Sequence, residues 1–154
     1  MSNVLARKRG ISEMEFYGTA EKLRKELSDL LFRDKALAKK YRANVTYPAL
    51  ASVNRMMALM HHANRIYPYT PEQVERRKEI QQECIDCLDD VYEIMQYAMQ
   101  NAWWQTLHAT NRETGEPTIE RQHLEFHLAV IGDLMDREER LLIGWKRSTK
   151  LLKH

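Results

Sequence analysis

The residues of this chain that could do chemistry begin with a Cys-x-x-Cys motif, Cys84 and Cys87. Such a pair supports redox chemistry at a helix N-terminus, or forms half of a zinc site when a second pair exists. Here it lies inside an expected helix among carboxylates, and the chain has no other cysteine. His61 and His62 point about 100° apart on a helix, so they are poor joint ligands. We interpret both cysteines as small core residues and predict no metal and no cofactor.

A second motif, Glu120-x-x-His123, has the spacing found in di-iron helical bundles. That chemistry needs the motif twice, together with a glutamate from each remaining helix. No second copy exists, and residues 45–67, which form the expected second helix, contain no acid. The sequence therefore argues against a di-iron centre.

The best enzymatic alternative uses Arg121 and His127, which fit the Arg-x4-6-His spacing of the HEPN ribonucleases, themselves helical bundles. The spacing is not specific, because Arg55 forms it with both His61 and His62. The polar residue that usually follows the arginine in that family is also missing. An RNA-cutting enzyme therefore stays an alternative, and we predict that the chain is not an enzyme.

Clustered positive charge is the remaining chemical signal, although the formal net charge is only +2. Apart from the segment 33–42, the clusters comprise Arg7, Lys8, Arg9, Arg76, Arg77, Lys78, Lys146, Arg147 and Lys150. We expect residues 76–78 at one pole of an antiparallel bundle and both chain ends at the other, with the acids of 83–93 as a waist between them. Such an arrangement favours contact with a polyanion without a sequence code.

Apolar residues recur at three- and four-residue steps in four segments, which predicts four amphipathic helices. The first is expected from Ser12, with Glu15 completing a capping box, to about Arg33. The second should end near residue 66, with a kink or restart at Pro48. The third starts after Thr70 as N-cap and extends past residues 103 and 104, and the fourth follows a polar loop at 110–118.

These segments predict an all-α fold, an antiparallel up-and-down four-helix bundle that assembles into a homo-oligomer. The 154 residues, 44% of them apolar, suit one domain over 1–154, with a basic N-terminal arm (1–11) and a basic C-terminal tail (146–154). The N-terminus lacks a signal-peptide pattern, and no apolar run approaches the roughly 20 residues of a membrane span. We therefore expect a cytoplasmic protein without membrane contact.

Five aromatic residues could stack on bases or anchor a partner: Trp103, Trp104, Trp145, Tyr67 and Tyr69. Core packing is the alternative for each. Trp145 lies on the apolar stripe of the fourth helix and is expected in the core. Neighbouring Trp103 and Trp104 cannot both point inward, so one of them should be exposed.

Four short motifs suggest a family: Arg9-Gly10-x-Ser12, Asn64-Arg65-Ile66-Tyr67-Pro68, Glu75-Arg76-Arg77 and Trp145-x-Arg147-Ser148. With them the chain resembles the Avd-like four-helix-bundle proteins. These are accessory variability determinants of diversity-generating retroelements, related to the bundle proteins encoded in ribosomal-RNA intervening sequences. The resemblance implies a homopentamer that binds nucleic acid and a reverse transcriptase, supports cDNA synthesis from a template RNA, and has no active site.

Charge pattern and resemblance together predict a non-enzymatic RNA- or DNA-binding accessory subunit of a retroelement reverse transcriptase. The phosphate contacts are assigned to the nine basic residues of the clusters named above. Two alternatives remain: the HEPN-like RNA-cutting enzyme and a purely structural oligomerisation module.

Overall fold

The computed structural model describes residue 11 and residues 14–152 of the chain. Among these residues it is all-helical, and the β-type pairing is limited to one isolated bridge between Thr110 and Pro117. The all-α class is therefore confirmed for the described part. Its α-helices are α2 (Glu15–Leu31), α3 (Tyr47–Asn64), α4 (Pro71–Gln100), α5 (Trp104–Leu107) and α6 (Ile119–Ser148).

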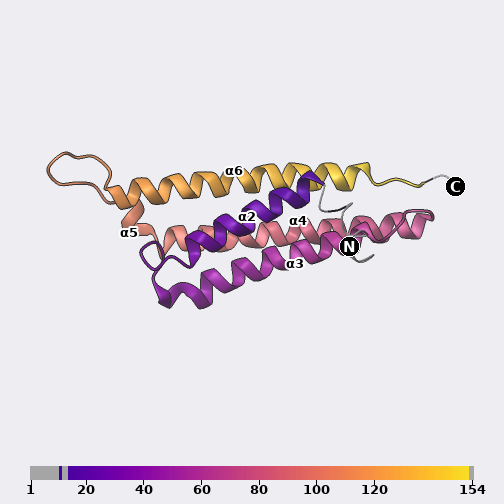
Figure 1. The fold of residues 1–154 in the computed structure, drawn as a ribbon, viewed down its shortest axis with the longest axis horizontal. Coiled ribbons are helices and arrows are strands. Elements are labelled where there is room, and N and C mark those ends of the chain that lie inside the picture. Colours follow the sequence, from indigo (N-terminus) through magenta and orange to yellow (C-terminus); the bar gives the residue numbers. More distant parts are fainter. Residues whose placement is uncertain (1–10, 12–13, 153–154) are drawn as a thin grey trace, which may run out of the picture.

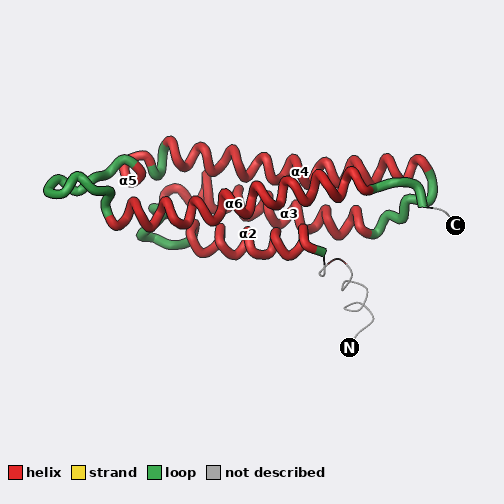
Figure 2. The backbone as a smooth tube through the Cα atoms, turned by 90° about the horizontal axis from the view of Figure 1, so that it is seen from above, coloured by secondary structure: helices red, strands yellow, loops and turns green. Residues whose placement is uncertain are grey.

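The long helices α2, α3, α4 and α6 lie side by side and form an elongated molecule (Figures 1 and 2). Helix α2 contacts α3 and α6, and α4 contacts the same two helices. Chain direction alternates from one long helix to the next (Figure 1). As a result, one end holds the α3–α4 connection and the end of α6, and is called the α3–α4 end below. The opposite end, which holds α5 and the loop before α6, is called the α5 end.

This alternation corrects the expected placement of the basic clusters. The prediction put residues 76–78 and the end of the fourth helix at opposite poles. Instead, the backbone N–H of Leu152 donates to the carbonyl of Pro68 in the α3–α4 connection, at 2.8 Å. The predicted placement is wrong because the third helix begins and the fourth ends at the same end when directions alternate.

The core is an apolar seam between these helices, and the predicted stripe of the third helix is part of it. Cys84, Leu88, Val91, Met95 and Ala98 are all buried on α4. They follow each other at alternating four- and three-residue steps, the repeat of left-handed helix packing. Burial of this stripe confirms the helix face that the sequence predicted.

The segment around Pro48 contains irregular helix. A 3₁₀ turn (Lys39–Tyr41) and a π-helical segment (Arg42–Thr46) lead directly into α3. Pro48, the second residue of α3, has no amide N–H to donate, and the residues directly before α3 form the π-helical segment. The expected restart at Pro48 therefore takes the form of a continuous change from π- to α-helix.

A capping box was predicted at the start of two helices, and the structure shows it at one of them. At α4, Thr70 and Gln73 form the predicted capping box, in which the Gln73 amide donates to Thr70 Oγ1 at 3.2 Å and the Thr70 amide donates to Gln73 Oε1 at 3.0 Å. Helix α2 begins at Glu15 after Met14, without a side-chain cap. Ser12, the predicted cap of this helix, lies outside the described residues.

The end of α4 differs from the expectation, since the helix stops at Gln100 and does not continue past residues 103 and 104. The Trp103 amide turns back to the carbonyl of Ala98 at 2.8 Å, and its indole Nε1 donates to the carbonyl of Ala36 at 2.9 Å. Trp103 is 1% exposed and Trp104 is 54% exposed. Only one of the two tryptophans is buried, as predicted, and it lies beyond the end of α4.

Candidate nucleic-acid interface

The α3–α4 end gathers the predicted phosphate contacts that the structure describes. Arg76, Arg77 and Lys78 lie in the first turns of α4, and Lys146, Arg147 and Lys150 lie in the last turn of α6 and just beyond it. Arg7, Lys8 and Arg9 lie outside the described residues. Two segments about 70 residues apart in the chain therefore contribute cations to one surface.

Three hydrogen bonds hold the end of α6 against α4 and the α3–α4 connection. Thr149 Oγ1 donates to the buried Oε1 of Gln81 at 3.0 Å, and Lys146 Nζ donates to Gln82 Oε1 at 2.8 Å. The third is the bond from the Leu152 amide to Pro68. The segment that carries the basic residues at the end of α6 is thereby held against the start of α4 and the α3–α4 connection.

Arg77 differs from its neighbours because tertiary contacts engage its guanidinium. Its Nη1 donates to the carbonyl of Ile66 at 3.0 Å, and the group lies over the ring of Trp145, 5.7 Å from the centroid. Burial lowers the pKa of Arg77 from its usual value. Trp145 in turn stacks on Phe16 at 4.1 Å, in line with its expected core role. Arg77 thus connects the α3–α4 connection to α6, and phosphate binding by it stays a prediction.

A shallow groove beside these residues combines positive charge with aromatic surface. It is lined by Arg65, Ile66, Tyr67, Tyr69, Glu72, Gln73 and Arg76. The rings of Tyr67 and Tyr69 stack on each other at 6.2 Å and are 62% and 41% exposed as residues. Exposed aromatic rings next to arginines are typical of surfaces that bind single-stranded nucleic acid. The groove is the candidate site.

Arg65 is the residue of this groove that charge clustering missed. It stands alone in the sequence, between Asn64 and Ile66, so a search for runs of basic residues passes over it. It reaches the groove because α3 ends at Asn64 and the chain turns there. Its place within the Asn64–Pro68 motif was the only signal available.

A second groove continues along α4 toward α6. Pro71, Val74, Glu75, Lys78, Glu79, Gln82 and Lys146 line it. Arg76 also pairs with Glu79 at 3.5 Å on the exposed surface. Lys78 and Lys146 are half-buried, and Glu75 and Glu79 line the same groove. The surface is therefore more mixed in charge than the basic clusters alone predicted.

The cysteines of the Cys-x-x-Cys motif are core residues, as predicted. Cys84 and Cys87 are free and buried, and Cys84 Sγ donates to the carbonyl of Met56 at 3.6 Å. Burial raises the pKa of the Cys84 thiol to about 12 and raises that of Cys87. A thiol with so high a pKa stays protonated at neutral pH and is a poor nucleophile and metal ligand.

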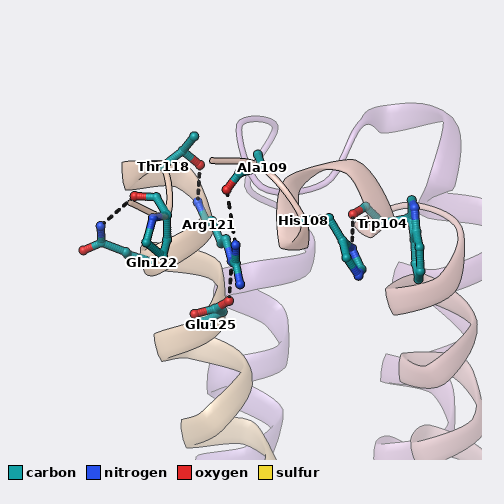
Figure 3. A network of polar contacts seen from close by, with 8 residues as sticks. Trp104, His108, Ala109, Thr118, Arg121, Gln122 and Glu125 are labelled. Atoms are coloured by element: carbon teal, nitrogen blue, oxygen red, sulfur yellow. Dashed lines mark hydrogen bonds and ion pairs between the residues drawn. The ribbon is translucent and has the colours of Figure 1, made fainter. Parts of the chain in front are cut away.

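The arginine and histidine of the HEPN-like spacing have separate partners. Arg121 Nε donates to Glu125 at 2.8 Å and Arg121 Nη1 donates to the carbonyl of Ala109 at 3.4 Å, so the guanidinium joins α6 to the loop before it (Figure 3). His127 Nε2 lies 3.1 Å from Nε2 of His123. The Arg121 contacts are those of a structural residue, which does not favour the ribonuclease alternative.

No family model, no curated protein and no solved structure matches the chain. None of the described helices combines the length and the apolar composition that crossing a membrane requires.

Proposed function

We propose that this chain is a non-enzymatic cytoplasmic subunit that binds RNA or DNA at its α3–α4 end. One observation carries the proposal. Exposed Arg76 lines one groove with the stacked rings of Tyr67 and Tyr69, and exposed Arg147 and Lys150 lie at the same end of the molecule. Cations that neutralise phosphates and rings that stack on bases are the two elements of sequence-tolerant binding to single strands.

Phosphate contacts and base stacking depend differently on salt concentration. Each neutralised phosphate releases condensed counterions, which makes the negative slope of log affinity against log salt steeper by roughly 0.7 to 0.9. Each stacked base adds about 1–3 kcal/mol and depends little on salt. Substitution of arginines should therefore change the salt slope, whereas substitution of Tyr67 and Tyr69 should change the affinity at constant slope.

The wider proposal includes the assembly and the partner. We propose that the four long helices form an antiparallel up-and-down bundle, that copies of it associate into a homo-oligomer, and that the oligomer serves a retroelement reverse transcriptase. Tyr92 and Tyr97, 53% and 40% exposed on α4, support a contact between subunits. The pentamer and the reverse transcriptase rest on the family resemblance alone. Light scattering, and co-purification with such a reverse transcriptase, test them.

The test of nucleic-acid binding compares two double charge reversals with the same change in net charge. Arg76→Glu with Arg147→Glu should weaken binding of a labelled RNA in fluorescence anisotropy and make the negative salt slope shallower by about 1.4 to 1.8. Lys22→Glu with Lys25→Glu, on exposed positions of α2, is the control and should leave both unchanged. Equal behaviour of the two variants would contradict the proposal.

The same samples separate the alternatives when the RNA is also run on a denaturing gel. Binding without cleavage supports the proposal. Cleavage that Arg121→Ala and His127→Ala abolish would favour the ribonuclease. An oligomer that neither binds nor cleaves RNA would favour the structural module.

A further inference from the structure

A cluster of nitrogen-bearing side chains lies at the α5 end, away from the proposed interface. Arg33 follows α2, while His123 and His127 lie one turn apart on α6. Arg33 Nη1 lies 3.1 Å from His123 Nε2, and His127 Nε2 lies 3.1 Å from the same atom. Two elements therefore bring a guanidinium and two imidazoles to one exposed point. Of these three residues, the HEPN-like spacing pointed only to His127.

Charged neighbours act on the His123 imidazole. The pKa of His123 is lowered, first by partial desolvation and then by the charges of His127 and Arg33. Two nearby carboxylates are engaged with other cations, because Glu125 pairs with Arg121 and Asp34 with Arg42, both at 2.8 Å. Exposed Glu120, three residues before His123, lies on the same face of α6. The guanidinium of Arg33 supplies the permanent positive charge of the cluster.

An exposed aromatic ring adjoins the cluster. Phe126 is 64% exposed, and its ring meets that of His127 edge to face, with centroids 5.4 Å apart. Such a ring on a helix surface has no core to pack against, and its free face suits stacking with a planar ligand.

We propose that Arg33, His123 and His127 bind the phosphate of a nucleotide whose base stacks on Phe126. The Arg33 guanidinium offers several charge-assisted N–H donors, the type of hydrogen bond that phosphate oxygens accept most strongly, and imidazole N–H groups add further donors. The nucleotide is either free or part of a nucleic-acid strand.

A transition metal is the competing ligand, and the geometry makes it worth excluding. Two nitrogens at 2.0–2.1 Å from a tetrahedral ion lie about 3.3 Å apart, close to the separation of the two Nε2 atoms. However, the Arg33 guanidinium beside them repels a cation. The described residues also provide no group of three or more His, Cys, Asp or Glu side chains suited to a metal ion. An anion satisfies all three side chains, whereas a metal satisfies two.

This site is independent of the interface proposed at the α3–α4 end, because the two lie at opposite ends of the molecule. Either can fail without the other. Small probes keep them separate, since inorganic phosphate, adenosine and AMP report on the cluster without an extended strand. An oligonucleotide added afterwards tests whether the natural ligand is a free nucleotide or a nucleic-acid strand. If it is a strand, Arg33→Gln should weaken binding of the oligonucleotide; if it is a free nucleotide, that binding should not change.

The experiment follows the histidine Cε1–H signals by NMR at pH 6, at constant ionic strength. AMP should shift the signals of His123 and His127 saturably, with a lower dissociation constant than inorganic phosphate. The signal of His62, exposed on α3, should not change. Arg33→Gln should weaken both ligands about tenfold, because a charge-assisted hydrogen bond is lost. Phe126→Ala should weaken AMP about fivefold or more and leave phosphate unchanged.

A matched control is Arg112→Gln, which removes an exposed arginine from the loop at the same end and should leave both affinities unchanged. Three outcomes would overturn the proposal. His123 and His127 fail to respond to phosphate and AMP, Arg33→Gln titrates like the unmodified chain, or Zn²⁺ shifts both histidines saturably while AMP does not.

Discussion

The two ends of the molecule differ in whether their buried polar side-chain groups, such as those of Trp103 and Glu138, have hydrogen-bond partners. Near the α5 end, Trp103 fills the interior and its only polar atom donates to the carbonyl of Ala36. In the half of α6 nearer the α3–α4 end, Glu138 is fully buried, and neither carboxyl oxygen has a hydrogen-bond partner among the described residues. Gln81, also fully buried, accepts from Thr149 through Oε1, but its Nε2 has no such partner.

This difference shows where the fold gains stability and where it loses some. A buried ring with a satisfied N–H stabilises the α5 end. A buried carboxyl without a partner costs free energy, and it costs much more when it is ionised than when it is protonated. The α3–α4 half, which also carries the candidate interface, is therefore the part in which pH should govern stability.

The largest expected effect is at the α5 end. Trp103→Ala should lower the free energy of unfolding by about 3–5 kcal/mol, because it leaves a cavity and removes the donor to the Ala36 carbonyl. Urea denaturation measures this. Trp104→Ala removes an exposed ring of the same kind and should change stability by only about 0.5 kcal/mol. Similar losses of stability in both variants would mean that burial of the Trp103 ring does not stabilise this end of the molecule.

The next effect is on the pH dependence of stability. Burial raises the pKa of Glu138 to about 8 from its ordinary 4.5, while nearby Arg137 acts in the opposite direction. Between these values the folded state binds more protons than the unfolded state, so stability should fall as pH rises from about 4.5 to 8. Glu138→Gln should remove that decline and be more stable than the unmodified chain at pH 8 by a few kcal/mol.

Thermal unfolding at several pH values measures this decline. Glu139→Gln, at the exposed neighbouring position, is the control and should keep it. If Glu138→Gln declines over the same pH range as the unmodified chain, another group is responsible and the contrast between the two ends is lost.

The smallest expected effect distinguishes a stabilising role from a binding role for the neighbouring arginines 76 and 77. Arg77→Met should cost about 1–2 kcal/mol of stability, because it removes the donor to the Ile66 carbonyl and the contact with Trp145. Arg76→Met breaks only an exposed pair with Glu79 and should cost less than about 1 kcal/mol. RNA affinity should show the reverse order if Arg76 holds a phosphate. Denaturation and anisotropy on the same two variants test both statements.

Local physical chemistry made part of this structure readable in the sequence. Thr70, Pro71 and Gln73 specify the start of α4 because a capping box and a proline in the first turn act over four residues. The alternating stripe around Cys84 and Leu88 specifies the buried face in the same way, through helix periodicity. The basic residues could be found as well, since charge is a property of composition.

What each charge does, however, depended on residues far away in the chain. Arg76 and Arg77 are equivalent in sequence, but only Arg77 meets the carbonyl of Ile66 and the ring of Trp145. Helix direction decided which basic segments share an end, because the position of one helix terminus is fixed by all the helices before it. For the same reason Arg33 and His123, 90 residues apart, meet at a distance of 3.1 Å. Sequence periodicity thus determined the faces of the helices, and only their packing determined which faces and ends came together.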